Sequence, residues 1–343
     1  MSSWKNFYMK GNTKTSNKTK LFLLAASACL AASAILNICI GASDLDLAGL
    51  WKALISGPDQ SAAARIVWYV RLPRTGACLL AGAALAVAGA VIQKVLDNNL
   101  ASPGIIGINA GAGLAVAVCC AIGWLSSWFI AGFAFLGAVI ATFLVVLTAQ
   151  KSGASRTTVV LGGVAVTACL NAVTEAIITL IPDAALASAD FRAGGFSSVN
   201  AGRLIPASIV IPICIFILWS LSNEMDVLAL GDDTAHSLGM NTVAVRNVLL
   251  ALGALLAGAA VSFAGVLGFV GLIVPHMVKR FTDTQSRVVI PSCALAGAGF
   301  VAVCDLVARM LFAPFELPAG ILMSAMGGPF FIWLLWKRKG KRA

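Results

Sequence analysis

Ten runs of mainly apolar residues divide this chain, and each is long enough to form a membrane-crossing helix. A helix needs about 20 consecutive apolar residues to cross the ~30 Å hydrocarbon core of a bilayer. Only 11% of the 343 residues are charged, against about 25% in soluble domains. The sequence therefore predicts an all-α, polytopic membrane protein with ten transmembrane helices. Allowing for interruptions by glycine and proline, these helices are expected near residues 21–41, 72–96, 104–123, 128–149, 157–181, 204–222, 244–263, 266–281, 288–312 and 318–336.

The net charge of +10 is concentrated at the two ends of the chain, in residues 1–20 and 337–343. Basic segments that flank membrane helices stay in the cytoplasm. We therefore expect two basic cytoplasmic tails, 1–20 and 338–343, around one transmembrane domain, 21–337. The first run could instead be a signal peptide, but its length suits a membrane span. The tails also account for the basic charge without a nucleic-acid partner.

Two apolar segments nearly repeat each other. LLAGAALAVAGAV (Leu79–Val91) and LLAGAAVSFAGVL (Leu255–Leu267) agree at eight of thirteen positions. In the ten-helix topology they fall on the second and seventh helices, which run in opposite directions. This arrangement predicts an inverted internal repeat, which is typical of transporters. The alternative is that membrane helices rich in small residues resemble one another by composition alone.

The sequence gives no indication of an active site. It lacks the G-x-x-x-x-G-K-[ST] loop that binds the phosphates of ATP, so an ion gradient or another protein must supply energy. The nine cysteines show no metal-ligand spacing, and His236 and His276 are the only histidines. We therefore expect no catalytic residue, no metal site and no cofactor bound by this chain.

The predicted helix 157–181 carries a polar stripe. Its members recur every three to four residues, which places them near one face of a helix. A charge facing lipid at mid-helix costs about 2.5 to 3.5 kcal/mol, so this face should turn toward protein or water. We interpret the stripe as lining a translocation path, although hydrogen bonding between helices explains its uncharged members equally well. The residues are Thr167, Asn171, Thr174, Glu175 and Thr179.

The segment Met225–Val243 is acidic, although cytoplasmic loops of membrane proteins are usually basic. Asp232 and Asp233 suit the positive end of a short helix. The leucines of this segment would project beside the charges, as in a helix that docks into a groove of another protein. An amphipathic connector on the membrane surface is the alternative.

Seven strings of this chain match one known family, in the order in which that family has them. They are RLPR (71–74), LLAGAALAVAGAVIQ (79–93), NNLASPGIIGINAGAG (98–113), LALGDDTAHSLGM (228–240), GFVGLIVPHMVKR (268–280), DLVAR (305–309) and ELPAGI (316–321). On these strings the chain resembles, from about residue 21 to 337, the permease subunits of the FecCD family, which belong to ABC importers for ferric siderophores, haem and vitamin B12.

The resemblance implies a homodimer in the inner or plasma membrane, with two cytoplasmic ABC ATPase subunits that bind ATP-Mg and an extracytoplasmic substrate-binding protein. It implies docking of the binding protein at Arg71, Arg74 and Arg309. Asp305 lies one helical turn from Arg309, so a purely structural ion pair is the alternative there. Coupling to the ATPase is implied for Leu228, Leu230, Gly231, Asp232, Asp233, Ala235, Leu238 and Gly239.

The cargo is less constrained than the architecture. The string FRAGGFSSVNAGR (191–203) looks closer to vitamin B12 permeases than to siderophore permeases, but haem and iron chelates stay open. We therefore expect the permease subunit of an ATP-driven importer for a bulky metal chelate. A gradient-driven secondary transporter is the alternative from another class, and a membrane scaffold without transport is a third.

Overall fold

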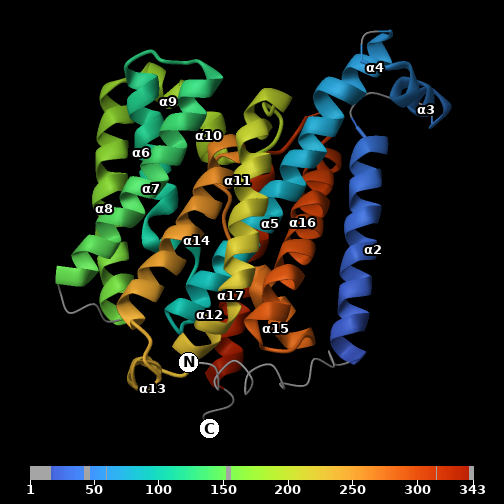
Figure 1. Ribbon diagram of the computed structural model, residues 1–343. Coiled ribbons are helices and arrows are strands. Elements are labelled where there is room, and N and C mark those ends of the chain that lie inside the picture. The colour runs from blue at the N-terminus through green and yellow to red at the C-terminus, as the bar shows by residue number, and fades with distance from the viewer. Residues whose placement is uncertain (1–16, 42–46, 59, 152–155, 314, 340–343) are drawn as a thin grey trace.

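The computed structural model describes residues 17–41, 47–58, 60–151, 156–313 and 315–339. No strand occurs in these ranges, and the longer helices form one bundle (Figure 1). They are α2 (Asn17–Cys39), α5 (Leu72–Val95), α6 (Ile108–Ala121), α7 (Ser127–Lys151), α8 (Arg156–Leu180), α11 (Ala201–Ser220), α14 (Thr242–Ala264), α15 (Val270–Phe281), α16 (Ser286–Leu311) and α17 (Ala319–Lys339).

These helices correspond in order to the ten expected runs, and the prediction of an all-α, polytopic fold is confirmed. Six helices in the described part of the chain are long and apolar enough to cross a membrane. The number becomes seven when the bent pair of α11 and α12 (Ser222–Leu228) counts as one span. The length criterion alone thus supports fewer spans than the ten predicted.

Short helices gather at the two ends of the bundle (Figure 1). One end, called here the α3 end, carries α3 (Leu47–Ser56). The opposite end, called the α13 end, carries α12 and α13 (Asp232–Ser237). The other short elements at the α3 end are α4 (Ala62–Ile66), η1 (Val67–Arg71), α9 (Pro182–Ala187) and α10 (Ala189–Ala193).

Helix α5 is the centre of the bundle, and it packs against α14, α15 and α16. Glycines allow the closest of these approaches. A Cβ atom added to Gly82 would overlap the backbone of Gly297 on α16, and one added to Gly89 would overlap the backbone of Gly271 on α15. Small residues of this kind let helix backbones approach closely where lipid provides no hydrophobic driving force. The small-residue repeat thus forms the core.

The two repeated segments lie on α5 and at the end of α14, and these helices pack against each other. Helix α5 runs from the α3 end toward the α13 end, whereas α14 runs the opposite way (Figure 1). The opposite directions are those expected from the ten-helix topology.

Two breaks interrupt the helical pattern, one between α5 and α6 and the other between α14 and α15. The expected run 104–123 is a 3-10 turn, η2 (Pro103–Ile106), followed by α6 from Ile108. The expected run 266–281 is helical only from Val270, because residues 265–268 connect α14 to α15 without helix and Phe269 adopts a left-handed φ of 63°. Helices α6 and α15 are correspondingly short, so non-helical backbone lies between the two ends of the bundle.

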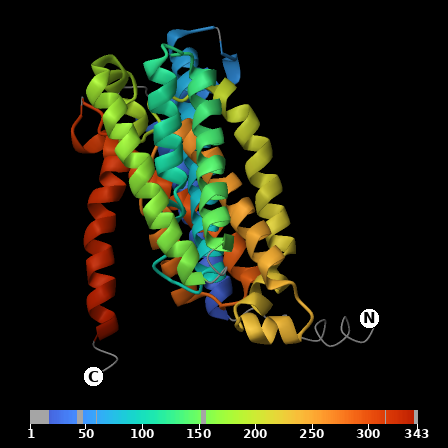
Figure 2. The ribbon, with the colours of Figure 1, turned by 90° about the vertical axis from the view of Figure 1, so that its left-hand side faces the viewer.

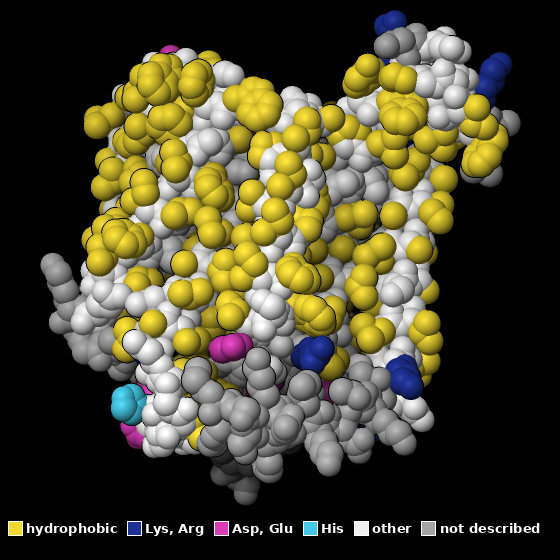
Figure 3. Space-filling view, in the orientation of Figure 1, with side chains coloured by type: hydrophobic (Ala, Val, Ile, Leu, Met, Phe, Trp, Pro, Cys, Tyr) yellow, Lys and Arg dark blue, Asp and Glu magenta, His cyan; other side chains and the backbone are white. Residues whose placement is uncertain are grey.

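The outer helices are much less covered than the centre. In the most apolar window of α8, 11% of residues are buried, against 78% in the window that includes α5. Hydrophobic side chains spread over the sides of the bundle, while Lys, Arg, Asp and Glu gather near its two ends (Figure 3). This distribution is that of a protein whose sides face lipid. The predicted tails fall mostly on residues 1–16 and 340–343, outside the described residues.

Candidate functional site

The predicted ATPase-coupling segment lies across the α13 end of the bundle. The chain bends by 56° between α11 and α12, and α12 and α13 then lie beneath the longer helices (Figures 1 and 2). Gly231, with a φ of 107°, allows the turn between α12 and α13, and Gly239, with a φ of 79°, allows the chain to leave α13. Few residues other than glycine adopt such angles without strain.

The structure divides the apolar residues of this segment into two groups. Leu228 and Ala235 are fully buried, so they hold the segment on the bundle, and the expectation that Leu228 projects outward is wrong. Leu230 and Leu238 are 60% and 44% exposed. Asp233 is exposed as well. The exposed residues together form a surface of mixed apolar and acidic character that a partner can contact.

Asp226 and Asp232, the other acidic residues of the segment, form ion pairs within the chain. Asp226 accepts a hydrogen bond of 2.6 Å from Lys94 Nζ at the end of α5, and one of 2.8 Å from Ser286 Oγ at the start of α16. We call Lys94, Asp226 and Ser286 the α16 junction. It ties α12 to two helices of the bundle.

A second junction forms around Asp232. Its Oδ2 lies 2.6 Å from a guanidinium nitrogen of Arg246 on α14, and its Oδ1 lies 3.4 Å from one of Arg156, the first residue of α8. Arg156 also donates to the carbonyl oxygen of Leu228 at 2.8 Å and lies 3.3 Å from Asp97. We call these five residues the α8 junction.

The α8 junction keeps the Asp232 carboxylate ionised. Burial alone raises the pKa of this carboxyl, but the hydrogen bond from Arg246 and the charges of Arg246 and Arg156 outweigh that effect. The pKa of Asp232 therefore lies below its ordinary value. Asp232, predicted as an ATPase-coupling residue, thus makes its ion pairs with the bundle.

The polar stripe of α8 is split by the structure. Thr174 is buried and donates to the carbonyl oxygen of Leu170 at 2.9 Å, so it satisfies its hydroxyl within the helix. Thr167 is half-buried, and its hydroxyl oxygen has no hydrogen-bond partner among the described residues. The other three members, Asn171, Glu175 and Thr179, are exposed. The uncovered face of α8 thus carries a carboxylate, an amide and a hydroxyl.

A groove of ≈ 360 Å³ lies where the two helix breaks meet α17. Its lining is mostly apolar, with Ser102 and Asn109 as polar members. Phe269 lies against Gly327 of α17, where an added Cβ would overlap its side chain. Backbone that is not helical and lies within membrane depth is tolerated where it is buried in protein or lines a water-filled cavity. The groove and the exposed stripe of α8 thus both need something other than lipid beside them.

The three arginines predicted to dock a binding protein lie at the α3 end, with buried side chains. Arg74 is paired with Asp305 at 2.9 Å and with Glu316 at 2.7 Å. Arg309 lies 3.3 Å from the same Asp305 and also donates to the side chain of Asn37 on α2. The pair with Asp305 that the sequence offered as an alternative for Arg309 is therefore present.

Arg71 has a different environment from the other two arginines. It is buried and donates to the carbonyl oxygens of Ile38 and Cys39, at 2.7 and 2.8 Å. These carbonyls belong to the last turn of α2, where intrahelical donors are lacking. Arg71 therefore caps α2 as well as lying near the α3 end.

Sequence reasoning missed the residues that hold the coupling segment in place: Lys94, Arg156, Asp226 and Arg246. Charge balance could have indicated these residues, since an acidic segment that lies beside basic helix ends is expected to form ion pairs with them. Charge balance does not identify the partners, because Lys94 and Asp226 are 132 positions apart and meet only through the fold.

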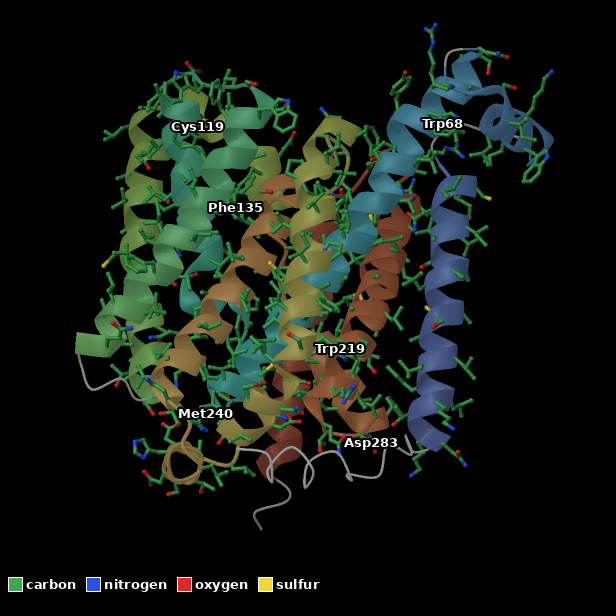
Figure 4. All side chains as sticks on the ribbon, in the orientation of Figure 1. Trp68, Cys119, Phe135, Trp219, Met240 and Asp283 are labelled. Atoms are coloured by element: carbon green, nitrogen blue, oxygen red, sulfur yellow. The ribbon has the colours of Figure 1, made fainter. Side chains whose placement is uncertain are left out.

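Met240 and Asp283 mark the α13 end of the bundle in Figure 4, and Trp68 marks the α3 end.

Comparison with known proteins finds vitamin B12 permeases among the relatives of this chain. The chain is 37% identical over 320 residues to the vitamin B12 import system permease protein BtuC of Escherichia coli, covering 92% of this chain and 95% of that protein. It is 39% identical over 274 residues to BtuC of Shigella sonnei, covering 79% and 83%.

Solved structures agree with this result. One ABC transporter, described as of the metal-chelate type and in an inward-facing conformation, matches with a TM-score of 0.82 and 26% identity, covering 93% of this chain and 99% of that one. PsaBC from Streptococcus pneumoniae matches with a TM-score of 0.56 and 17% identity, covering 81% and 92%, which shows likeness of fold alone. The model of the FecCD transport family matches residues 29–337, and the chain therefore belongs to that family.

Proposed function

We propose that this chain is the membrane-spanning subunit of an ATP-driven importer that moves a bulky metal chelate into the cell, and that the chelate is a corrinoid. Family membership supports the transporter class. The corrinoid is favoured because the relatives at 37% and 39% identity are named vitamin B12 permeases. The Gly194–Gly195–Phe196 string points the same way.

The main support for this proposal is the face of the subunit formed by the exposed side of α8 and the groove at the helix breaks. Glu175 is exposed on α8, and the groove is lined by residues at the two helix breaks, Ser102 and Asn109 among them. Neither feature suits lipid, whereas both suit the wall of a passage between two copies of the chain. We therefore place the translocation path along this face of a homodimer, with Asn171, Glu175 and Thr179 toward the cargo. Thr174 and Thr167 would support that wall from behind.

The α13 end would face the cytoplasm and bind two ABC ATPase subunits that hold ATP-Mg. The start of α2 and the end of α17 lie at this end, and the basic tails that continue from them favour the cytoplasm (Figure 1). The exposed residues Leu230, Asp233 and Leu238 would then contact the ATPase. The two halves of the subunit would be related by an inverted repeat, with α5 and α14 as counterparts.

A substrate-binding protein would dock at the opposite, extracytoplasmic end, in the inner or plasma membrane. Docking by Arg71, Arg74 and Arg309 stays a prediction, and their burial changes how it must be tested. Reversing Arg74 to Glu would place a second carboxylate beside buried Asp305, so loss of docking would not be distinguishable from misfolding.

Glu316→Gln gives a cleaner docking test. The Glu316 side chain is 33% exposed and neutralises Arg74 from the outside. If carboxylates of the binding protein seek Arg74, then Glu316→Gln should tighten docking to the solubilised dimer and Arg74→Lys should weaken it. Surface plasmon resonance measures both. Unchanged affinity in both variants would mean that these arginines are structural.

Reconstitution tests the proposed function as a whole. The dimer, the candidate ATPase and the candidate binding protein are placed in liposomes, and uptake of cyanocobalamin, haem and a ferric hydroxamate is measured with and without ATP. We expect ATP-dependent accumulation of cyanocobalamin in the absence of any ion gradient. Uptake that needs a proton or potassium gradient and ignores ATP would support the secondary transporter instead. ATP-dependent uptake of only the haem or the hydroxamate would overturn the corrinoid assignment.

A further inference from the structure

The segment formed by α12 and α13 is held at two points that differ in kind. At the α16 junction, Asp226 contacts Lys94 on α5 and Ser286 on α16. Both helices belong to the most buried part of the bundle, where 78% and 61% of their apolar windows are covered. This end of the segment is thus attached to the core.

The other end of the segment is attached in part to a loosely covered helix. Arg156 is the first residue of α8, whose apolar window is only 11% buried. From that position its guanidinium reaches the Leu228 carbonyl oxygen, Asp232 and Asp97. Leu228 is the last residue of α12, and Asp232 is the first of α13. Arg156 therefore touches the segment on both sides of the Gly231 turn.

The α16 junction and the Arg156 contact should yield by different amounts when the α12–α13 segment moves. The glycine contacts of α5 with α15 and α16 leave no room for displacement, and packed interiors resist compression. Helix α8 has one such contact, between Gly163 and the backbone of Ile105, but only 11% of its apolar window is buried, so it is the element of lower resistance. A displacement of α12 and α13 about the α16 junction would thus pass through Arg156 into α8.

Arg246 completes this arrangement. Its side chain is 4% exposed, and it holds Asp232 from the α14 side at 2.6 Å. The Asp232 carboxylate therefore lies between a buried arginine of the central α14 and the Arg156 of peripheral α8. A carboxylate shared by two arginines can strengthen one contact while the other lengthens, because both remain charge-assisted.

We propose that Arg156 is a positioning residue that transmits movement of the α12–α13 segment to α8, with the α16 junction as the fixed point of that movement. The inference rests on the proposed function, because it takes the segment to be where the ATPase acts. It goes further in assigning the internal route, which runs through Arg156 to the helix that carries Glu175. The ATPase-facing residues Leu230, Asp233 and Leu238 do not take part in it.

The experiment compares Arg156→Gln with Arg287→Gln in the complete importer. Arg287 is an exposed arginine at the same end of the bundle, 5.4 Å from the ring centroid of Trp219 and outside both junctions. Spin labels at Leu180→Cys, the far end of α8, report the distance between the two copies, in a background where the exposed Cys29 and Cys169 are Ser. Distances are recorded without nucleotide and with ADP-vanadate, together with ATP hydrolysis and cargo uptake.

We expect Arg287→Gln to match the parent complex. We expect Arg156→Gln to hydrolyse ATP while its α8 distance no longer responds to nucleotide, and its cargo per ATP to fall roughly tenfold, a usual size for coupling between linked sites. Arg156→Lys keeps the charge but cannot reach all three acceptors at once, so it should fall between these two.

The outcomes separate the two proposals. A parent complex with neither ATP-dependent uptake nor an α8 response would overturn the proposed function. A responsive parent with an equally responsive Arg156→Gln variant would overturn the transmission role alone. If Arg156→Gln does not assemble, Arg156→Lys decides: full response and full uptake in that variant would mean that Arg156 is only structural.

Discussion

Asp305 is a fully buried carboxylate, and Arg74 and Arg309 both lie against it. Removing one partner of a buried ion pair typically costs 3 to 5 kcal/mol, since it leaves the other charge without compensation. We therefore expect Arg74→Ala to lower the free energy of unfolding by about 2 to 4 kcal/mol, because Arg309 remains as a partial partner. Thermal unfolding of the detergent-solubilised protein measures this. Glu316→Gln, which removes a partly exposed partner, is the control and should cost less than about 1 kcal/mol.

Asp232 gives a prediction about pH. Its pKa is lowered in the folded chain, so the stability it contributes is present above the unfolded value and is lost as pH falls through the folded one. At roughly neutral pH, about 6 to 8, the carboxylate stays ionised, so the free energy of unfolding of the parent should exceed that of Asp232→Asn by a constant amount. This difference should be below about 1 kcal/mol, because the ion pair is partly exposed. Unfolding measured from neutral to acid pH should show the gap closing below the ordinary value of 3.8. A gap that widens in acid would contradict the assigned ion pairs.

At the residue scale, the sequence predicts which arginines belong together better than it predicts which side chains surround them. Arg71, Arg74 and Arg309 are predicted as one docking group, and the ends of η1, α5 and α16 that carry them lie at the α3 end (Figure 1). Their internal partners lie far away in sequence: Asp305 is 231 positions from Arg74. Helical periodicity finds neighbours three or four residues apart, which is why it offered Asp305 for Arg309 but not for Arg74.

At the scale of elements, the glycine contacts of α5 make a strong prediction. Gly89→Ala would add a Cβ that overlaps the backbone of Gly271, which cannot rotate away as a side chain can. We expect the loss of folded protein in membranes, despite the gain of about 1 kcal/mol in helix propensity from Gly to Ala. Gly113→Ala on α6 is the matched control, since a Cβ there meets nothing within 4 Å. Fluorescence-detected size-exclusion chromatography compares them, and equal yields would contradict the packing described.

Element boundaries show what apolar runs can and cannot predict. The runs 128–149 and 157–181 agree closely with α7 and α8, because these helices are continuous. The runs 104–123 and 266–281 were too long, since η2 and the link before Val270 are apolar without being helical. Hydropathy reports burial in lipid or protein, whatever the backbone conformation, so a break inside an apolar run is invisible to it.

For the whole molecule, the proposed dimer makes a cross-linking prediction. The chain is a multi-pass membrane permease rather than an enzyme, by its family. If two copies cover the α8 face, Glu175→Cys should cross-link to its counterpart or to the partner's adjoining face with a short bifunctional reagent, in a background where the exposed Cys29 and Cys169 are Ser. Ile209→Cys is the control and should not cross-link, because Ile209 is 57% exposed on α11, which lies on another side of the bundle from α8 (Figure 2). Native mass spectrometry of the purified protein should give twice the chain mass of 35.2 kDa. A native mass equal to that of one chain, or equal cross-linking of both variants, would contradict the proposed dimer and mean that the α8 face contacts lipid.

A second prediction at this scale concerns cargo. Glu175→Gln and Asn171→Ala should change the uptake rate or the preference among chelates, because both side chains are exposed on the face assigned to the path. Ser208→Ala, exposed on α11, should change neither. Initial uptake rates in liposomes check this. If all three variants behave like the parent, the stripe is not part of the path.

The family resemblance, the all-α class and the transporter class were all predictable from the sequence and are confirmed. The side chains that are exposed on the uncovered face of α8 could not be predicted from the sequence. The five polar residues of α8 share an arc, but whether Thr174 or Glu175 faces outward depends on where α6 and α7 pack, and that contact leaves no periodic signal in α8 itself.

The backbone contacts of Gly82 and Gly89 have an evolutionary consequence. Where two polypeptide backbones touch, there is no rotamer to exchange and no volume to trade between neighbours, so the centre of this subunit cannot be remodelled one substitution at a time. Gly163 and Gly320 impose the same restriction where α8 and α17 pack on their neighbours, but the exposed positions of these two helices do not carry it. New preferences for a transported compound can therefore arise at the periphery, while the same central helix is inherited unchanged beneath them.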